Sequence, residues 1–164
     1  MRNSLFILVA AGILAIQPAF AQSTATQSVN LTVNTVYKIS TSGNPSPLTV
    51  TTGTAGTDAL TSVSDNSTTY NITQNFGNTV KITANLDAVL QAGYTLKINL
   101  ASSKGTSAGT IDISNATSGG ALSVVTGINR GADASQAITY TFSALASAGA
   151  LTATSKTVTL TLTN

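Results

Sequence analysis

The chain has 164 residues and a formal net charge of +2, and only 7% of its residues are charged. It contains no histidine, cysteine, tryptophan or glutamate. This composition removes the side chains that most often transfer protons or bind transition metals, and it leaves no disulfide to support the fold. The few lysines are scattered, so no basic stripe predicts a nucleic-acid partner.

The N-terminus has the features of a secretory signal peptide. Arg2 gives a short basic region, residues 5–16 form an apolar core, and Ala19-Phe20-Ala21 matches an A-x-A cleavage site. Roughly 20 apolar residues would be needed to span a bilayer, so we expect a leader over residues 1–21 and not a membrane anchor. The exported chain would begin at Gln22, form a single domain over residues 22–164, and be located in the periplasm, at the cell surface or outside the cell.

Alternation of apolar and polar residues runs through the rest of the chain and predicts half-buried strands. Nine candidate strands follow in order: residues 29–39, 48–50, 70–76, 80–86, 94–100, 111–113, 122–124, 138–142 and 158–162. Turn-forming residues separate them at 42–47, 53–58, 77–78, 102–109, 115–120 and 127–134. Residues 87–91 and 144–153 are the two stretches in which a helical turn is expected.

Short strands with one apolar face must bury that face against other strands. The prediction is therefore an all-β fold, an antiparallel two-sheet sandwich of the immunoglobulin-like or pilin-like type. A small closed barrel fits the same pattern, whereas a membrane barrel needs longer strands with aromatic girdles.

Candidate chemical sites are few. Asp58 and Asp65 are the best carboxylate pair for a hydrolase, but the residues around each are also typical of turns. Asp65-Asn66 and Gly131-Ala132-Asp133 each offer one carboxylate to calcium, which usually needs several. We therefore predict no catalytic residue, no cofactor and no metal site, and no enzyme activity.

Two stretches suggest other roles. Thr157, Thr159, Thr161 and Thr163 form a row like those of ice-binding surfaces, although threonine is also common at solvent-facing strand positions. The alternating segment 29–39 follows a polar run and can pair within its own domain or add to a neighbour's sheet.

The final alternation, from Thr157 to Thr163, resembles the last strand of bacterial fimbrial subunits and of secreted immunoglobulin-like modules. The segments 62–70, 80–84 and 92–97 are also similar to small exported β-sandwich proteins of bacteria with no assigned activity. The disulfide of many chaperone–usher pilins is absent. The resemblance implies a secreted structural or adhesive surface protein that assembles with itself or with other subunits through strand edges. The alternative is a carbohydrate- or matrix-binding module, which would need Tyr37, Tyr70, Tyr94 or Tyr140 exposed together.

Overall fold

The computed structural model describes residues 23–164. The expected leader, residues 1–21, and Gln22 lie outside the described residues, so the cleavage site stays a prediction. The chain divides into two units, and the fold below is that of Asn34–Asn164. Residues 23–33 contain no helix or strand.

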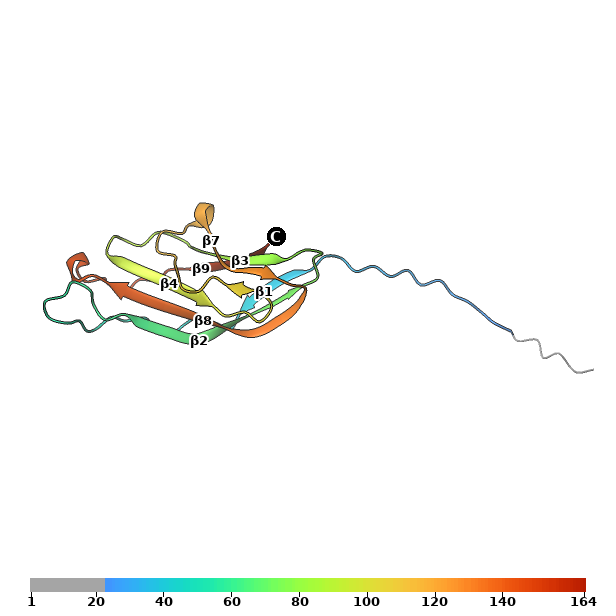
Figure 1. The fold of residues 1–164 in the computed structure, drawn as a ribbon, viewed down its shortest axis with the longest axis horizontal. Helices are drawn as coiled ribbons and strands as arrows, with labels where there is room; N and C mark the ends of the chain where they lie inside the picture. The colour runs from blue at the N-terminus through green and yellow to red at the C-terminus, as the bar shows by residue number, and fades with distance from the viewer. Residues whose placement is uncertain (1–22) are drawn as a thin grey trace, which may run out of the picture. The chain divides into compact units, whose positions relative to one another are not determined.

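The fold is all-β, with two antiparallel sheets, as predicted (Figure 1). The five-stranded sheet has the order β1 (Tyr37–Thr41), β2 (Val63–Gln74), β8 (Gly131–Ala144), β4 (Tyr94–Leu100) and β6 (Ile111–Asp112). The four-stranded sheet has the order β5 (Thr106–Ser107), β7 (Leu122–Ile128), β3 (Val80–Leu86) and β9 (Val158–Thr163). Two single 3-10 turns, η1 (Ser118–Gly120) and η2 (Ala146–Ala148), are the helical elements of the described residues.

The alternation in the sequence becomes one buried and one solvent-facing side of each central strand. In β3, Ile82 and Leu86 are 0% and 1% exposed, while the intervening Lys81, Thr83 and Asn85 are half-exposed. β4 alternates in the same way and contributes side chains such as that of Ile98 to the same core cluster. Since burial of one such side chain stabilises a fold by about 1.5–3 kcal/mol, this shared core is the main source of stability in a chain without disulfides.

The loop between β1 and β2 replaces a predicted strand. Leu48 packs against the core, but residues 48–50 belong to no strand, and the backbone pairing within this loop is confined to residues 52–61, around the isolated bridge between Gly53 and Leu60. Pro45 and Pro47 lie just before residues 48–50 and have no N–H to donate, so a strand at these residues cannot extend toward the N-terminus.

Other boundaries differ as well. β5 lies within the predicted turn 102–109, η1 lies within the predicted turn 115–120, and the predicted turn 127–134 is reduced to Asn129 and Arg130 between β7 and β8. Of the two expected helical stretches, 144–153 contains η2 and 87–91 contains no helix. The first strand begins at Tyr37 and not at Val29.

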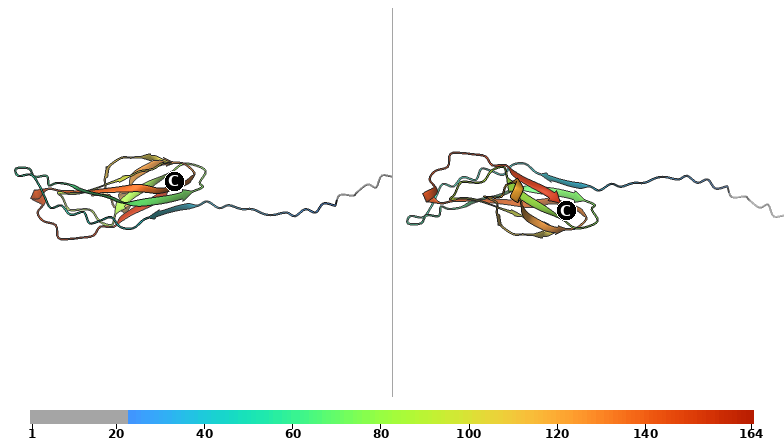
Figure 2. Two further views of the ribbon diagram at one scale, coloured as in Figure 1. Left: turned by 90° about the horizontal axis from the view of Figure 1, so that it is seen from below. Right: turned by 90° about the horizontal axis from the view of Figure 1, so that it is seen from above.

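Loop residues 42–62 and η2 lie together at one end of the strands (Figure 2). Leu60 N donates to Ala144 O at 3.0 Å, and Ala146 N donates to Asp58 O at 2.7 Å. Tyr94 also donates its hydroxyl to Ala148 O at 3.1 Å. These bonds close this end of the domain. No helix within residues 23–164 has the length and apolar character that a bilayer crossing requires.

Candidate functional site

The two aspartates considered for hydrolysis are held by separate sets of hydrogen bonds, one in a loop and one in β2. Asp58 accepts from the backbone N and the hydroxyl of Ser147 at 2.7 and 2.8 Å, which fixes η2 against the loop. Asp65, in β2, accepts from the hydroxyl of Ser67 at 2.7 Å, and this bond is the largest cause of a lowered pKa at Asp65. Each carboxylate is therefore occupied by its own serine, and this arrangement gives no support to an acid pair.

Asp133 is a buried structural residue and does not lie in a turn as expected. It lies in β8, is 3% exposed, and accepts four hydrogen bonds from residues 102–104. Burial raises the pKa of Asp133, but the hydrogen bonds from Ser103, Ser102 and Lys104 lower it further, so the net pKa lies below the usual value. Both carboxylate oxygens hold the loop that connects β4 to β5, which explains why this charge is buried.

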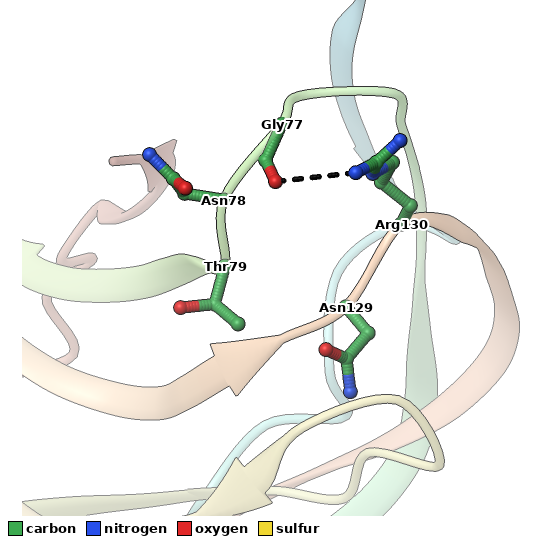
Figure 3. A pocket seen from close by; sticks show the side chains of 5 residues that line it. All are labelled: Gly77, Asn78, Thr79, Asn129 and Arg130. Atoms are coloured by element: carbon green, nitrogen blue, oxygen red, sulfur yellow. Dashed lines mark hydrogen bonds between the residues drawn. The ribbon is translucent and has the colours of Figure 1, made fainter.

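The described residues contain no cluster of three or more His, Cys, Asp or Glu that could hold a metal ion. One shallow surface pocket is lined by Gly77, Asn78, Thr79, Asn129 and Arg130, at the turns that follow β2 and β7 (Figure 3). Arg130 donates from its guanidinium to Gly77 O at 3.3 Å. None of these five residues is an acid or a nucleophile with an adjacent base, so the pocket has no arrangement for acid–base chemistry.

The tyrosines are part of the core and do not form an exposed platform. Tyr70, Tyr94 and Tyr140 are 0%, 6% and 8% exposed, and Tyr37 packs against Phe76 with ring centroids 5.4 Å apart. Burial raises the pKa of Tyr140, and it is also the largest cause of the raised pKa of Tyr70.

The threonines of β9 stand beside side chains of different kinds in the neighbouring strand β3. Thr159, Thr161 and Thr163 of β9 stand opposite Asn85, Thr83 and Lys81 of β3. The surface is thus hydroxyl-rich but is not an unbroken threonine array, which favours the reading of these residues as ordinary solvent-facing positions.

The strand edges, in contrast, are strongly asymmetric. On one side of the domain the sheets end in β5 and β6, which have two residues each, and such short edges offer little backbone for pairing. On the other side they end in β1 and β9, which have five and six residues and contact each other.

β9 is an open edge with an incompletely covered apolar face. Its residues pair with β3, and within the described chain residues 158–163 form no backbone hydrogen bond to any other segment. Val158, Leu160 and Leu162 are half-buried and stand opposite side chains of β3 that are 0–1% exposed. β9 contains no charged residue, although charge is a common way to block edge pairing, whereas β1 carries Lys38.

The segment before β1 has the complementary pattern. Val29, Leu31 and Val33 are 74%, 87% and 85% exposed, and polar residues alternate with them. The sequence predicted a strand here, but these residues form no strand in the structure. Three large apolar side chains at alternate positions are therefore exposed to solvent.

Comparison with known proteins gave no match: no family model fits the chain, and neither a curated protein nor a solved structure is significantly similar to it. Function is therefore inferred from the geometry of these edges.

Proposed function

We propose that this chain is an exported, non-catalytic structural or adhesive subunit of the cell surface, related in design to fimbrial subunits, that assembles with copies of itself. In this proposal the two sheets form an immunoglobulin-like sandwich. Residues 28–33 of one copy add as a strand to the free edge of β9 in the next copy.

The match between donor and acceptor is the observation that carries the proposal. The donor has exposed apolar side chains at positions 29, 31 and 33, and the acceptor has half-buried ones at 158, 160 and 162. Side chains that stand opposite each other in neighbouring strands point to the same face. With Leu31 opposite Leu160, all three donor side chains cover the acceptor's apolar face, whether the strands run parallel or antiparallel.

The energy of this contact favours reversible assembly. Burial of three Val or Leu side chains contributes roughly 4.5–9 kcal/mol at about 1.5–3 kcal/mol each. Association opposes this with at least about 4 kcal/mol of lost translational and rotational freedom. Ladder hydrogen bonds along β9 add to the favourable side, so we expect assembly that depends on protein concentration.

The alternative functions have less support. A carbohydrate- or matrix-binding module would use exposed aromatic side chains, and three of the four tyrosines are buried. A hydrolase would use a pair of acids, and Asp58 and Asp65 are each bonded to a different serine.

Disulfide trapping tests the proposal directly, because the chain has no native cysteine. The exported chain carrying Leu31→Cys is mixed with one carrying Leu160→Cys under mild oxidation, and covalent dimers are expected. Leu31→Cys mixed with Thr159→Cys is the matched control, since Thr159 faces the opposite side of β9. Leu31→Cys mixed with Ile39→Cys tests the rival edge at β1.

Assembly itself is measured by size-exclusion chromatography with light scattering over a range of concentrations. Leu31→Asp should prevent assembly, whereas Thr32→Asp introduces the same charge at a position that faces away from the acceptor's core side and should retain it. A wild-type chain that stays monomeric at high concentration would refute the proposal, as would equal behaviour of the two aspartate variants.

A further inference from the structure

Asn75 binds two of the three residues, Asn34 and Val36, that connect the N-terminal segment to β1. Val36 N donates to Asn75 Oδ1 at 2.6 Å, Asn75 Nδ2 donates to Asn34 O at 2.9 Å, and Asn75 N donates to Val36 O at 3.2 Å. Asn75 directly follows Gln74, which pairs with Tyr37 as the last register position between β1 and β2. The side chain of Asn75 thus continues the ladder beyond the end of the sheet.

This bonding pattern fixes the course of the chain. In an extended strand, the backbone groups of residues two apart point to the same side. Groups of both Asn34 and Val36 reach the one side chain of Asn75, so residues 34–36 continue β1 in line. A turn within these residues would break the side-chain bonds.

The topology shows what such a turn would be needed for. β9 ends at Thr163, opposite Lys81 near the start of β3, and only residues 75–79 separate β2 from β3. The C-terminal end of β9 and Asn75 therefore lie at the same end of the domain. β1 runs away from this end, because Tyr37 pairs with Gln74 and Thr41 with Tyr70.

A segment 28–33 that lay along β9 of its own molecule would have to run toward this end, since residue 34 is held there. The chain would then reverse between residues 33 and 37. The contacts of Asn75 oppose that reversal.

From this geometry we infer that Asn75 is a positioning residue, which keeps the N-terminal segment from covering β9 of its own molecule and so leaves both for a second copy of the chain. The inference rests on the proposed function for its partner, a second copy, but the contacts of Asn75 can be tested in the monomer alone.

Asn75→Ala removes two of the three hydrogen bonds and keeps the one from the backbone. An exposed hydrogen bond shifts an equilibrium by roughly 2- to 10-fold. We therefore expect the balance between self-covered and partner-covered states to shift on the order of tenfold or more. Asn71→Ala is the matched control: Asn71 lies in β2, four residues before Asn75, and its side chain bonds to Ser40 of β1 and to Ser135 N, with no hydrogen bond to residues 34–36.

The first readout is amide hydrogen exchange of residues 28–33 in dilute, monomeric protein. These amides should exchange freely in the wild type and in Asn71→Ala, and they should become protected in Asn75→Ala, as the segment folds onto its own β9. Asn75→Asp keeps the acceptor for Val36 N and loses the donor to Asn34 O, so it should give intermediate protection and serves if the alanine variant folds poorly. Unchanged exchange in both Asn75 variants would overturn the inference.

The second readout is the concentration at which half of the protein assembles, which should rise on the order of tenfold in Asn75→Ala and stay unchanged in Asn71→Ala. An unchanged midpoint in Asn75→Ala would overturn the inference. If neither the wild type nor any variant assembles, the proposed function fails. Protection of residues 28–33 in monomeric Asn75→Ala would still support the role of Asn75.

Discussion

Asp133 is the residue whose substitution best tests how this low-charge fold is held together. Its Oδ1 accepts from the hydroxyl of Ser103 at 2.7 Å. Its Oδ2 accepts from the hydroxyl of Ser102 at 3.0 Å and from the backbone N of Ser103 and Lys104 at 2.9 and 3.2 Å. Asp133→Asn keeps the shape of the side chain and removes the charge.

The expected loss follows from these four bonds. The new amide NH₂ would face the Ser103 hydroxyl, which can rotate to accept, and the remaining oxygen would keep the other three donors. Charge-assisted hydrogen bonds are roughly twice as strong as neutral ones, so each of the three loses about 0.7–1.5 kcal/mol. The free energy of unfolding should fall by about 2–4.5 kcal/mol, and for a domain of this size each kcal/mol lowers Tm by about 3–5 °C.

Acid should remove this difference between wild type and variant. Hydrogen bonds hold the pKa of folded Asp133 below its usual value, and the unfolded pKa is about 3.9. A carboxyl with a depressed folded pKa stabilises the fold above the unfolded pKa, and this contribution is lost as the pH falls through the folded pKa. The stability gap should thus be constant above about pH 5 and shrink toward pH 2.

Urea unfolding of both proteins between pH 7 and pH 2 gives the measurement. Asp87→Asn is the matched control, because Asp87 is exposed and its side chain accepts one local bond, from Ala88 N at 2.9 Å. Equal losses in the two variants, or a gap for Asp133→Asn that does not change with pH, would refute this account.

Three further substitutions have clear expectations. Gly105→Ala would place its Cβ 2.7 Å from both Thr126 O and a side-chain carbon of Ile128, so thermal unfolding should show that the free energy of unfolding falls by about 1–3 kcal/mol. Gly77 has open space around it, so Gly77→Ala should unfold near the wild-type temperature. Tyr70→Phe loses the hydroxyl that donates to Ala101 O and should reduce stability by about 1 kcal/mol in urea at neutral pH. Thr161→Lys adds a charge to the outer face of β9, so light scattering should show weaker assembly, while the free energy of unfolding of the monomer in urea should change by less than about 0.5 kcal/mol. Undiminished assembly would argue against β9 as the acceptor.

The sequence alone predicted the central strands well because their alternation is a local signal. Residues 80–86 and 94–100 coincide with β3 and β4, and 158–162 lies within β9. The beginning of β2 was missed, since Ser64, Asp65, Asn66 and Ser67 are polar and the register shifts between Asp65 and Thr68. β5 has only two residues and no period to detect.

The features that position the candidate site depend on contacts that no local pattern marks. Asp133 is buried because residues 102–104, about 30 positions earlier, donate to it. Asn75 binds Val36 and Asn34 across 39 and 41 positions. Whether an alternating segment is paired, open or without a strand partner is likewise decided by sheet order, which explains why residues 29–36 were predicted as part of a strand and are not one.

The contrast between the two sides of the domain argues that the open edge of β9 is not accidental. A sheet protein without disulfides or many charges still needs to avoid unwanted pairing, and β5 and β6 do so by being two residues long. If edge exposure were merely tolerated, β9 would be expected to carry a charge or a proline, but it reads Val-Thr-Leu-Thr-Leu-Thr. The same chain leaves Val29, Leu31 and Val33 exposed, although exposed apolar side chains in series promote association. In the proposed assembly β9 is the acceptor and residues 28–33 are a donor of equal length. Each is a hazard alone, and strand addition between copies would remove both.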